Sequence, residues 1–273
     1  MNNLLFFIFV QIVGESLPIS SSSHVYLLSR LTVLPTLPTF FDHFLHGPTF
    51  IILLIFFRKE VSLFYKFTAA SSSSRKRLLK QFMHIMKVLM ITTPLAAAGY
   101  GFINGPLEHF IHSYYPVLML GGLIITMVSL YSLRYKKENY SKQSSCLTLY
   151  DATMLGCVQA LALLPGISRF ASTFVAAQWL GYSWKRSFQL SFLIELPLIV
   201  AAFFIKALPA LIRYHNLAQL FTPATVVTII GATIGGYLAL HGSWVLASKK
   251  KLWLFCLYLL IPIGITLFFI AKR

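Results

Sequence analysis

The sequence is short of charged side chains and very short of acidic ones. Charged residues make up 11% of the 273 positions, and only seven residues are Asp or Glu, whereas a soluble domain carries about 25% charged residues. This shortage argues against a soluble enzyme, because such a chain could not cover its surface with charge. With 57% hydrophobic residues and a mean hydropathy of +0.75, the sequence predicts an all-α integral membrane protein with several spans.

Cysteine is also scarce. The three cysteines, Cys146, Cys157 and Cys256, are odd in number and have no metal-ligand spacing, which argues against a disulfide framework and a thiolate metal site. Cys157 and Cys256 stand in apolar runs, so we expect both to be buried free thiols. The first residues lack a basic region and a small-residue cleavage site, so we expect no cleaved signal peptide.

Apolar segments recur along the chain, several of them close to the ~20 residues that cross a bilayer. They fall near 4–15, 44–57, 83–103, 116–133, 150–164, 187–212, 223–247 and 252–271. The formal charge of +16 comes from Lys and Arg in the short loops between them. That pattern is typical of cytoplasmic loops that face anionic lipid. The sequence therefore predicts membrane lipids, and not nucleic acid, as the partner of this charge.

The basic loops predict a topology. Loops 58–80, 134–142 and 249–251 are all predicted to be cytoplasmic, which leaves the C-terminus outside. The stretch 150–184 has cytoplasmic basic residues before and after it, so it must enter and leave from one side as a re-entrant helical hairpin. If the N-terminal segment is also re-entrant, its hairpin enters from the opposite face. The alternative that stays open is two ordinary spanning helices with a misjudged loop.

This topology predicts a single membrane domain, 1–273, made of a helical bundle of two inverted repeats near 1–133 and 150–273. Each repeat would carry one re-entrant hairpin with its tip near the middle of the bilayer. Non-helical backbone at that depth is tolerated only where it lines a cavity or is buried in protein. A site between the two tips follows from this arrangement.

Two serine-rich polar segments interrupt the apolar sequence, and they echo each other. Val10-Gln11 recurs as Val158-Gln159, and Ile19-Ser20 recurs as Ile167-Ser168 at the same offset. Each segment holds a helix-breaking proline. Ionisable groups at membrane depth are costly, so they usually mark a functional site. The echo predicts a duplicated fold with one site at its centre.

The first segment carries residues suited to a metal ion or to proton transfer. Gln11 and Glu15 are spaced i, i+4 and share a helical face. Their oxygens could hold a hard cation, Mg²⁺ or Ca²⁺, completed by water and substrate phosphates. Ser20 to Ser23 add hydroxyls, although a run of serines is more often a helix start or a surface loop. His24, taken alone, is more often a structural histidine.

The second segment carries residues suited to an anion. Arg169 is always charged, has no acid near it in the sequence, and has a planar donor fork that fits a phosphate. Gly166 permits a close approach of the backbone, and Ser168 begins a predicted helix whose N-terminus is a natural anion site. Together the two segments predict a site for a phosphorylated ligand within reach of lipid.

Both segments resemble the signatures of one family. Glu15-Ser-Leu-Pro-Ile-Ser-Ser-Ser-Ser-His24 resembles the (E/Q)xxxE–LPxSSxxH signature of the undecaprenyl-diphosphatase (bacitracin resistance) family. Pro165-Gly-Ile-Ser-Arg-Phe-Ala-Ser-Thr173 resembles its PGxSRSxxT signature. The resemblance implies interdigitated inverted repeats in the bacterial cytoplasmic membrane. It also implies an enzyme that removes one phosphate from undecaprenyl diphosphate, a polyprenyl diphosphate lipid, and so regenerates the carrier of cell-wall synthesis.

The resemblance also implies roles for particular residues. It puts Gln11 and Glu15 in the metal and acid/base centre, Ser20, Ser21 and His24 in the first polar loop, and Ser168, Arg169 and Thr173 in the phosphate cradle. The active site would face the outer side of the membrane. A homodimer stays open.

The chain departs from the family pattern at several positions. These are Phe170 for the usual serine, Ala171 for the usual glycine, Leu259 for the usual arginine, the altered order of His46-Gly47-Pro48, and the unusual acid Glu195. Losing the serine removes one phosphate hydrogen bond, worth about 1.5–3 kcal/mol when made to a charged group. The principal charged residues remain, so we expect a working enzyme.

The mechanistic hypothesis is metal-assisted phosphoryl transfer. Arg169 would neutralise the diphosphate, and Glu15 would bind the metal or act as a base. His24 would protonate the leaving oxygen, and the nucleophile is either water or Ser21. Two other classes stay open: a transporter or lipid-phosphate flippase on the same scaffold, and an inactive protein that binds lipid or assists assembly.

Overall fold

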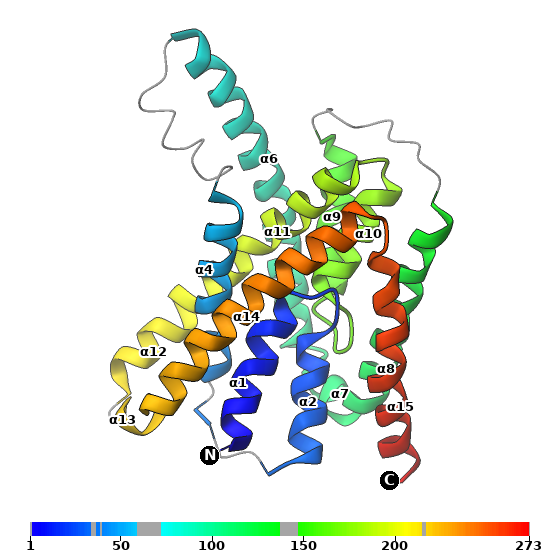
Figure 1. Cartoon of the computed structure of the whole chain (residues 1–273). Coiled ribbons are helices and arrows are strands. Elements are labelled where there is room, and N and C mark those ends of the chain that lie inside the picture. The colour runs from blue at the N-terminus through cyan, green and yellow to red at the C-terminus, as the bar shows by residue number, and fades with distance from the viewer. Residues whose placement is uncertain are drawn as a thin grey trace.

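The computed structural model describes residues 2–33, 37–38, 40–58, 72–136, 147–214 and 217–272. In these ranges the chain is helical and has no strand (Figure 1). Five of the helices are long and apolar enough to cross a membrane. The fold is therefore that of an all-α, multi-pass membrane protein, as the hydropathy predicts. Much of the predicted basic loops 58–80 and 134–142, together with Cys146, lies outside the described residues.

The first half of the chain runs through α1 (Asn2–Glu15), α2 (Ser21–Leu31), α3 (Phe41–Phe44), α4 (His46–Phe56), α6 (Ser72–Ile103), α7 (Glu108–Ser113), α8 (Tyr115–Ser132) and the 3₁₀ turn η1 (Leu133–Tyr135). The second half runs through α9 (Leu149–Leu161), α10 (Arg169–Trp179), α11 (Trp184–Val200), the π-helical stretch η2 (Ala201–Ala207), α12 (Leu208–Arg213), α13 (Leu217–Leu220), α14 (Pro223–Ser248), the 3₁₀ turn η3 (Leu252–Leu254) and α15 (Phe255–Ala271). These bounds follow the predicted apolar segments closely, except that α6 begins well before its predicted start.

The first polar segment forms the tip of a helical hairpin made by α1 and α2. α1 ends at Glu15, and the turn contains Pro18, which cannot continue a helix. Ser20 then caps α2, because its side chain accepts a hydrogen bond from the backbone N–H of Ser23. Figure 1 shows both outer ends of this hairpin at the end of the molecule that holds the two termini. The chain thus turns back at its first polar segment, as a re-entrant hairpin would.

The second polar segment forms the tip of the hairpin made by α9 and α10. The turn contains Pro165 and Gly166, and Gly166 has a φ of 88°, a conformation that favours glycine. Ser168 caps α10 by accepting a hydrogen bond from the N–H of Ala171 at 3.3 Å. The outer ends of this hairpin lie toward the end where α6 begins, opposite the outer ends of the first hairpin (Figure 1). The two hairpins therefore enter the bundle from opposite ends.

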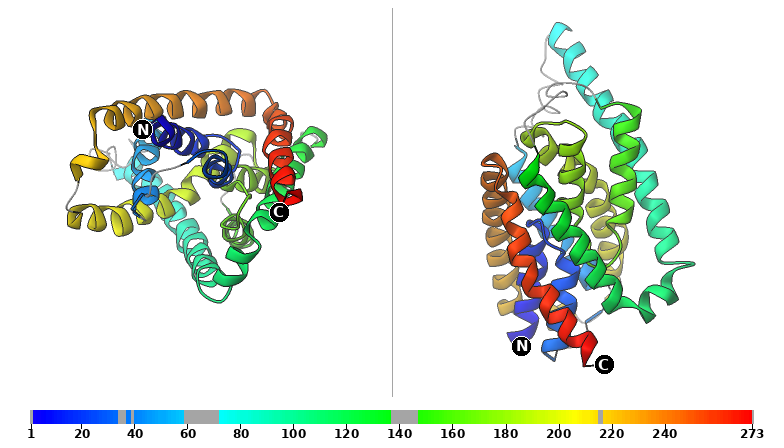
Figure 2. Two further views of the ribbon diagram at one scale, coloured as in Figure 1. Left: turned by 90° about the horizontal axis from the view of Figure 1, so that it is seen from below. Right: turned by 90° about the vertical axis from the view of Figure 1, so that its right-hand side faces the viewer.

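Each hairpin rests on long helices from the other half of the chain. α1 packs along α14 and α2 against α15, whereas α9 packs along α6 and α10 against α8. α8 packs against α15, and α4 against α11. Figure 2, seen from below, shows α14 running along one side of the bundle next to α1. Interdigitated inverted repeats would produce this exchange of partners, although the inverted repeat itself stays a prediction.

The tip of the second hairpin is packed directly against the backbone of α8. A Cβ added to Gly122 would lie 2.2 Å from the carbonyl oxygen of Pro165, so only glycine fits there. The hydroxyl of Thr126 accepts a hydrogen bond of 3.0 Å from the backbone N–H of Ser168, and it lies 3.2 Å from the carbonyl oxygen of Gly166. These contacts satisfy the exposed backbone of the turn and fix its position.

The tip of the first hairpin is held by α14. Ser243 donates a hydrogen bond to the carbonyl oxygen of Ser16 at 3.3 Å. A Cβ added to Gly236 would lie 2.7 Å from Cδ1 of Ile52 and 3.3 Å from Oγ of Ser16. The closest contacts of Gly236 at this tip are with side chains, whereas Gly122 meets the backbone of the second tip.

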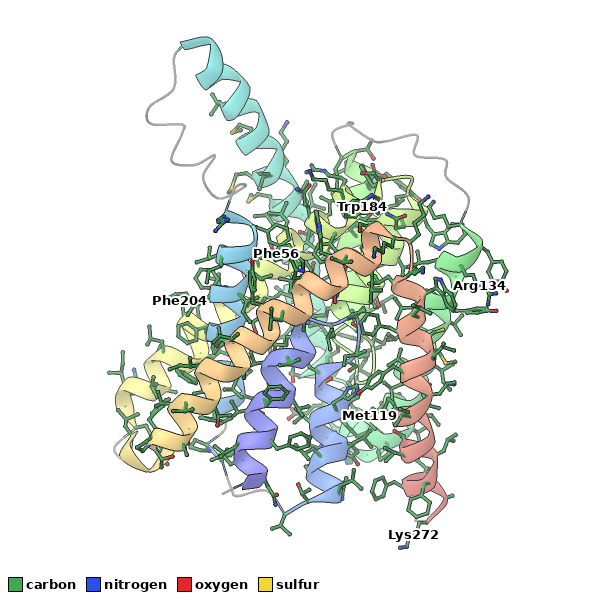
Figure 3. The ribbon with its side chains drawn as sticks, viewed as in Figure 1. Phe56, Met119, Arg134, Trp184, Phe204 and Lys272 are labelled. Carbon is green, nitrogen blue, oxygen red and sulfur yellow. The ribbon has the colours of Figure 1, made fainter. Side chains whose placement is uncertain are left out.

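Basic and aromatic side chains gather where α8 ends. Lys136 lies over the ring of Trp179, and Arg134 over the ring of Trp253, each 5.0 Å from the ring centroid. Figure 3 shows Arg134 near the start of α15 and Lys272 at its far end. Tryptophan together with Lys and Arg is typical of a membrane–water interface. This cluster agrees with the side on which the sequence predicts the cytoplasmic loops.

The two described cysteines differ in burial. Cys256 is buried and Cys157 is exposed, and both are free. The prediction that Cys157 is buried is wrong, because it shares an outward face of α9 with the exposed side chains of Met154 and Leu161. An apolar run in a membrane protein supplies lipid-facing residues as well as core residues, and the sequence does not distinguish them.

Candidate active site

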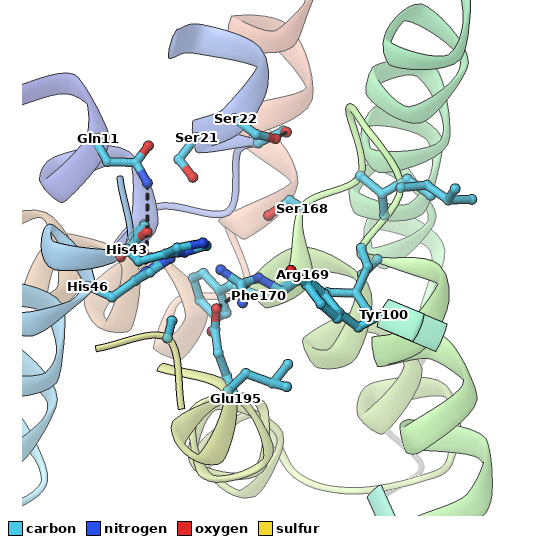
Figure 4. A pocket seen from close by; sticks show the side chains of 18 of the residues that line it. Gln11, Ser21, Ser22, His43, His46, Tyr100, Ser168, Arg169, Phe170 and Glu195 are labelled. Atoms are coloured by element: carbon cyan, nitrogen blue, oxygen red, sulfur yellow. Dashed lines mark hydrogen bonds and ion pairs between the residues drawn. The ribbon is translucent and has the colours of Figure 1, made fainter. Parts of the chain in front are cut away.

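A cavity of about 500 Å³ lies between the two hairpin tips and the helices α4, α6 and α11. Figure 4 shows Gln11 and His46 on one side of it and Arg169 with Glu195 on the other. The polar residues that line it are Gln11, Glu15, Ser20, Ser21, Ser22, His43, His46, Tyr100, Ser168, Arg169, Glu195 and Lys206. The two polar segments of the sequence therefore meet at one place in the fold.

Glu15 is the buried carboxylate of the first hairpin, and both of its oxygens have partners. Oε1 accepts a hydrogen bond from the side-chain amide of Gln11 at 2.9 Å and lies 2.7 Å from Nδ1 of His46. Oε2 accepts a hydrogen bond from the hydroxyl of Thr49. Gln11 is one turn earlier on α1, and His46 and Thr49 share a face of α4. A buried carboxylate needs such partners to be tolerated away from water.

His46 and Thr49 had no role in the sequence reasoning beyond the general resemblance. Both sit in the apolar segment 44–57, three residues apart, so a polar face on that segment was the signal that could have found them. The sequence does not show that this face packs against α1, where Glu15 lies.

Arg169 is the first residue of α10 and points into the cavity. Its Nε lies 3.2 Å from Oε1 of Glu195, a buried residue of α11. No acid lies near Arg169 in the sequence, and its acidic partner in the fold comes from a distant helix. With Nε bound to Glu195, the two Nη groups at the other edge of the guanidinium fork can still donate to a ligand.

The serines of the first tip lie next to Glu15. Ser21 lines the cavity, and a Cβ added to Gly14 would lie 3.1 Å from Cβ of Ser21. Ser21 thus packs on the last turn of α1. Within the described part of the chain its hydroxyl makes no hydrogen bond. Ser20 is committed to the cap of α2, where it binds the backbone N–H and the hydroxyl of Ser23.

The N-termini of α2 and α10 both open on the cavity. Each begins at a hairpin tip after a serine cap, Ser20 and Ser168 respectively, and the first residues of each line the cavity. The first N–H groups of a helix lack intrahelical partners, and the helix dipole is positive there. Two such ends facing one cavity make it suited to an anion.

Three of the predicted site residues do not line the cavity. Nδ1 of His24 lies 2.7 Å from the carbonyl oxygen of Ser20, and its Nε2 lies 3.0 Å from the hydroxyl of Tyr258 on α15. Thr173 donates its hydroxyl to the carbonyl oxygen of Arg169. Gly166 lies at the tip against α8. These residues support the two tips, and a direct role for them in chemistry stays a prediction.

Phe170, which replaces the usual serine, belongs to an aromatic cluster at the edge of the cavity. Its ring centroid lies 5.1 Å from that of Phe188 and 4.7 Å from that of Phe192 on α11. The side chain is almost fully buried. It therefore ties α10 to α11 near the Arg169–Glu195 pair.

The oxygen donors beside Glu15 fit a cation that a substrate completes. The amide nitrogen of Gln11 donates to Glu15, which leaves the amide oxygen of Gln11 for a cation, and Ser21 lines the same cavity. Among the described residues there is no group of three or more His, Cys, Asp or Glu side chains that could hold a metal. Mg²⁺ is usually bound by one or two carboxylates together with water and substrate phosphates, and this donor set suits that mode.

Comparison with known proteins gives a consistent family. Residues 5–266 match the model of the family described as bacitracin resistance protein BacA. The undecaprenyl-diphosphatase of Trichlorobacter lovleyi is 30% identical over 255 residues, which cover 91% of this chain and 89% of that protein. The undecaprenyl-diphosphatase of Halothermothrix orenii is 30% identical over 270 residues, 98% of this chain and 97% of that protein. The chain belongs to the BacA family.

Proposed function

We propose that this chain, as a member of the BacA family, hydrolyses undecaprenyl diphosphate to undecaprenyl phosphate and inorganic phosphate. The names of its relatives point to that substrate. The observation that carries the proposal is the meeting of Glu15 and Arg169, from opposite hairpins, in one cavity within the membrane-spanning bundle. The product would return to peptidoglycan synthesis as the lipid carrier.

Binding of the diphosphate is assigned to the second hairpin and to the two helix N-termini. The free Nη groups of Arg169 match the oxygens of a phosphate in a bidentate way. The N–H groups at the start of α2 and α10 add donors that are already oriented. Such fixed donors stabilise charge that builds up on the phosphoryl oxygens in the transition state, at no cost of reorganisation.

Proton transfer is assigned to Glu15. The nucleophile, either water or the hydroxyl of Ser21, loses its proton to the carboxylate as its oxygen bonds to the terminal phosphorus. His46 and Thr49 hold that carboxylate in place.

The bond from the terminal phosphorus to the bridging oxygen breaks, and the leaving group is undecaprenyl phosphate. Attack by water gives inorganic phosphate directly, whereas attack by Ser21 leaves a phosphoserine, which a water then hydrolyses to inorganic phosphate and a free serine hydroxyl. A phosphate monoester, with a second pKa of ~6, leaves without needing a proton from an acid, so the step does not require His24, whose ring nitrogens lie near Ser20 and Tyr258.

A divalent cation, Mg²⁺ or Ca²⁺, is part of the proposal. Gln11 and Glu15 would hold it, and it would offset negative charge on the diphosphate. The donor set described above supports this assignment.

The cavity is proposed to open to the outer side of a bacterial cytoplasmic membrane. Tyr100 lies in the last turn of α6, at the far end from the residues where that helix begins, and it lines the cavity. Figure 1 places the two termini at the same end. The positive-inside rule puts the basic loops in the cytoplasm, so this end would face outward.

Phosphate release from undecaprenyl diphosphate by the purified protein tests the proposal. With added Mg²⁺ or Ca²⁺ we expect steady release by the wild type and none above background by Glu15→Ala or Arg169→Ala. Glu108→Ala and Arg213→Ala remove the same charges from exposed positions outside the cavity, so they should retain activity. If the wild type released no phosphate with either ion, the proposed hydrolysis would be refuted. Lipid-phosphate transport into vesicles without hydrolysis would favour the carrier instead.

A further inference from the structure

The cavity contains a cation that the proposed chemistry does not use. Lys206 lines its outer end, together with Tyr100 and His43. The ammonium of Lys206 donates a hydrogen bond to the hydroxyl of Tyr100 and lies 4.1 Å from the centroid of that ring. No carboxylate of the described residues lies within ion-pair distance of it. The aromatic side chain holds the lysine by a cation–π contact and leaves its charge uncompensated.

The backbone around Lys206 departs from the regular helix. α11 gives way at Ala201 to the π-helical stretch η2, which contains Lys206. Ala201 and Lys206 are five residues apart and both line the cavity, which is the spacing of one π turn. π-helical turns are rare in proteins, and those that occur are often at functional sites. Here the turn brings a lysine, rather than another apolar residue, to the cavity wall.

The charged side chains around Glu15 and Arg169 are already paired, whereas Lys206 has no acidic partner among the described residues. Glu195 lies against Arg169, and His46 lies against Glu15. A phosphate group carries more than one negative charge at neutral pH, and a diphosphate carries a second phosphate group. Arg169 is partly offset by Glu195, and a divalent cation at Glu15 would be partly offset by that carboxylate, so the two together leave part of the diphosphate charge uncompensated. Within the described lining, Lys206 is the lysine or arginine without an acidic partner.

We propose that the outer end of the cavity is a second phosphate-binding subsite, formed by Lys206 and Tyr100. This inference rests on the proposed function. Lys206 supplies charge and N–H donors, while the Tyr100 hydroxyl, which accepts from Lys206, still has its own proton to donate. The phosphate group is either the second phosphate of the lipid substrate or the inorganic phosphate on its way out. The subsite thus makes Lys206 a binding residue for a phosphate group rather than an anchor at the membrane surface.

Lys206→Gln tests the subsite with two measurements. The first is the steady-state KM and kcat for undecaprenyl diphosphate, and the second is inhibition of that reaction by inorganic phosphate. Loss of a charge-assisted contact should raise KM, or weaken phosphate inhibition, by about tenfold. Lys206→Arg keeps the charge and should restore most of the lost binding. Tyr100→Phe keeps the ring and removes the hydroxyl, so its effect should be in the same direction and smaller.

Lys272→Gln is the matched control. Lys272 lies over the ring of Phe268 at 5.9 Å from its centroid. Figure 3 shows Lys272 at the end of the molecule where Figure 1 marks both termini, and it does not line the cavity. It should behave as the wild type. If Lys206→Gln raises KM without changing phosphate inhibition, the subsite binds the phosphate of the lipid. If it weakens phosphate inhibition without changing KM, the subsite binds the released phosphate. Lys206→Gln and Lys272→Gln behaving alike in both measurements would overturn the subsite.

Calorimetric titration of the purified protein with inorganic pyrophosphate separates this proposal from the proposed function. Weaker binding of pyrophosphate by Lys206→Gln than by Lys272→Gln would support the subsite even if the wild type released no phosphate. Equal binding by the two variants would count against it.

Discussion

The two hairpins have the same architecture and opposite chemistry. Each turns at a proline, begins its second helix after a serine cap, and rests on helices of the other half of the chain. The first brings the carboxylate of Glu15, held by side chains of α4, whereas the second brings the guanidinium of Arg169, held by Glu195 of α11. α4 and α11 in turn pack against each other. A duplicated scaffold can thus supply a base and a cation to one site from two copies of one motif.

The largest expected effect is on the acidic side of this comparison. Glu15→Gln keeps the size of the side chain and removes its ability to accept a proton, so kcat for phosphate release should fall by about 10²–10⁴-fold. Glu108→Gln, at an exposed position of α7, should leave kcat unchanged. Equal rates for the two variants would show that proton transfer does not depend on the first hairpin.

The basic side should respond almost as strongly. Arg169→Lys keeps the charge but loses the planar fork and the contact of Nε with Glu195, so it is not a conservative change. We expect kcat to fall by about 10²–10³-fold, the loss found when a transition-state donor is removed. Arg213→Lys, on the exposed side of α12, is the control. An Arg169→Lys enzyme as active as the control would mean that charge alone suffices.

The two tips should also differ in their tolerance of an added methyl group. Gly122→Ala puts a Cβ against the backbone oxygen of Pro165, and we expect it to destabilise the protein by about 1–3 kcal/mol. Gly236→Ala meets the end of the Ile52 side chain, which can move, so its effect should be smaller. Gly121→Ala has nothing within 4 Å of the added atom and is the control. Thermal unfolding in detergent should rank the three variants in this order, and a Gly122→Ala protein as stable as the control would contradict the packing.

The smallest effect concerns the partner of Arg169. Glu195→Gln removes a negative charge beside the diphosphate and keeps a hydrogen-bond acceptor for Arg169, so KM should fall by about threefold to tenfold. Glu195→Ala removes the acceptor as well, and because Arg169 then loses its anchor, kcat should fall by about tenfold. Steady-state kinetics would separate the two cases. A higher KM for Glu195→Gln would mean that the acid helps to bind substrate.

Much of this site could be predicted from local sequence, whereas the side chains that pair with its charged residues could not. Hydropathy and loop charge predicted the spans, and two short polar segments predicted Gln11, Glu15, Ser21 and Arg169 as residues of one cavity. Each of those inferences uses spacing along a single segment. The acid that pairs with Arg169 depends on which helix lies opposite, and no periodicity encodes that.

The surroundings of other residues also depend on distant helices. His24 was predicted from its neighbours in sequence, and its ring lies toward Tyr258 because α15 packs against α2. Lys206 stood in an apolar segment as a lone basic residue, and only the π turn of η2 brings it to the cavity. Cys157 shows the same limit, since an apolar run does not reveal which of its faces meets lipid.

The double variant Glu15→Gln, Arg169→Lys tests most directly whether the two hairpins form one site. The measurement is kcat for phosphate release from undecaprenyl diphosphate by the wild type, the two single variants and the double variant. Residues that act as a unit give strongly non-additive losses, so the double variant should be about as slow as the slower single variant. A loss equal to the product of the two single losses, or full activity in either single variant, would contradict a shared site.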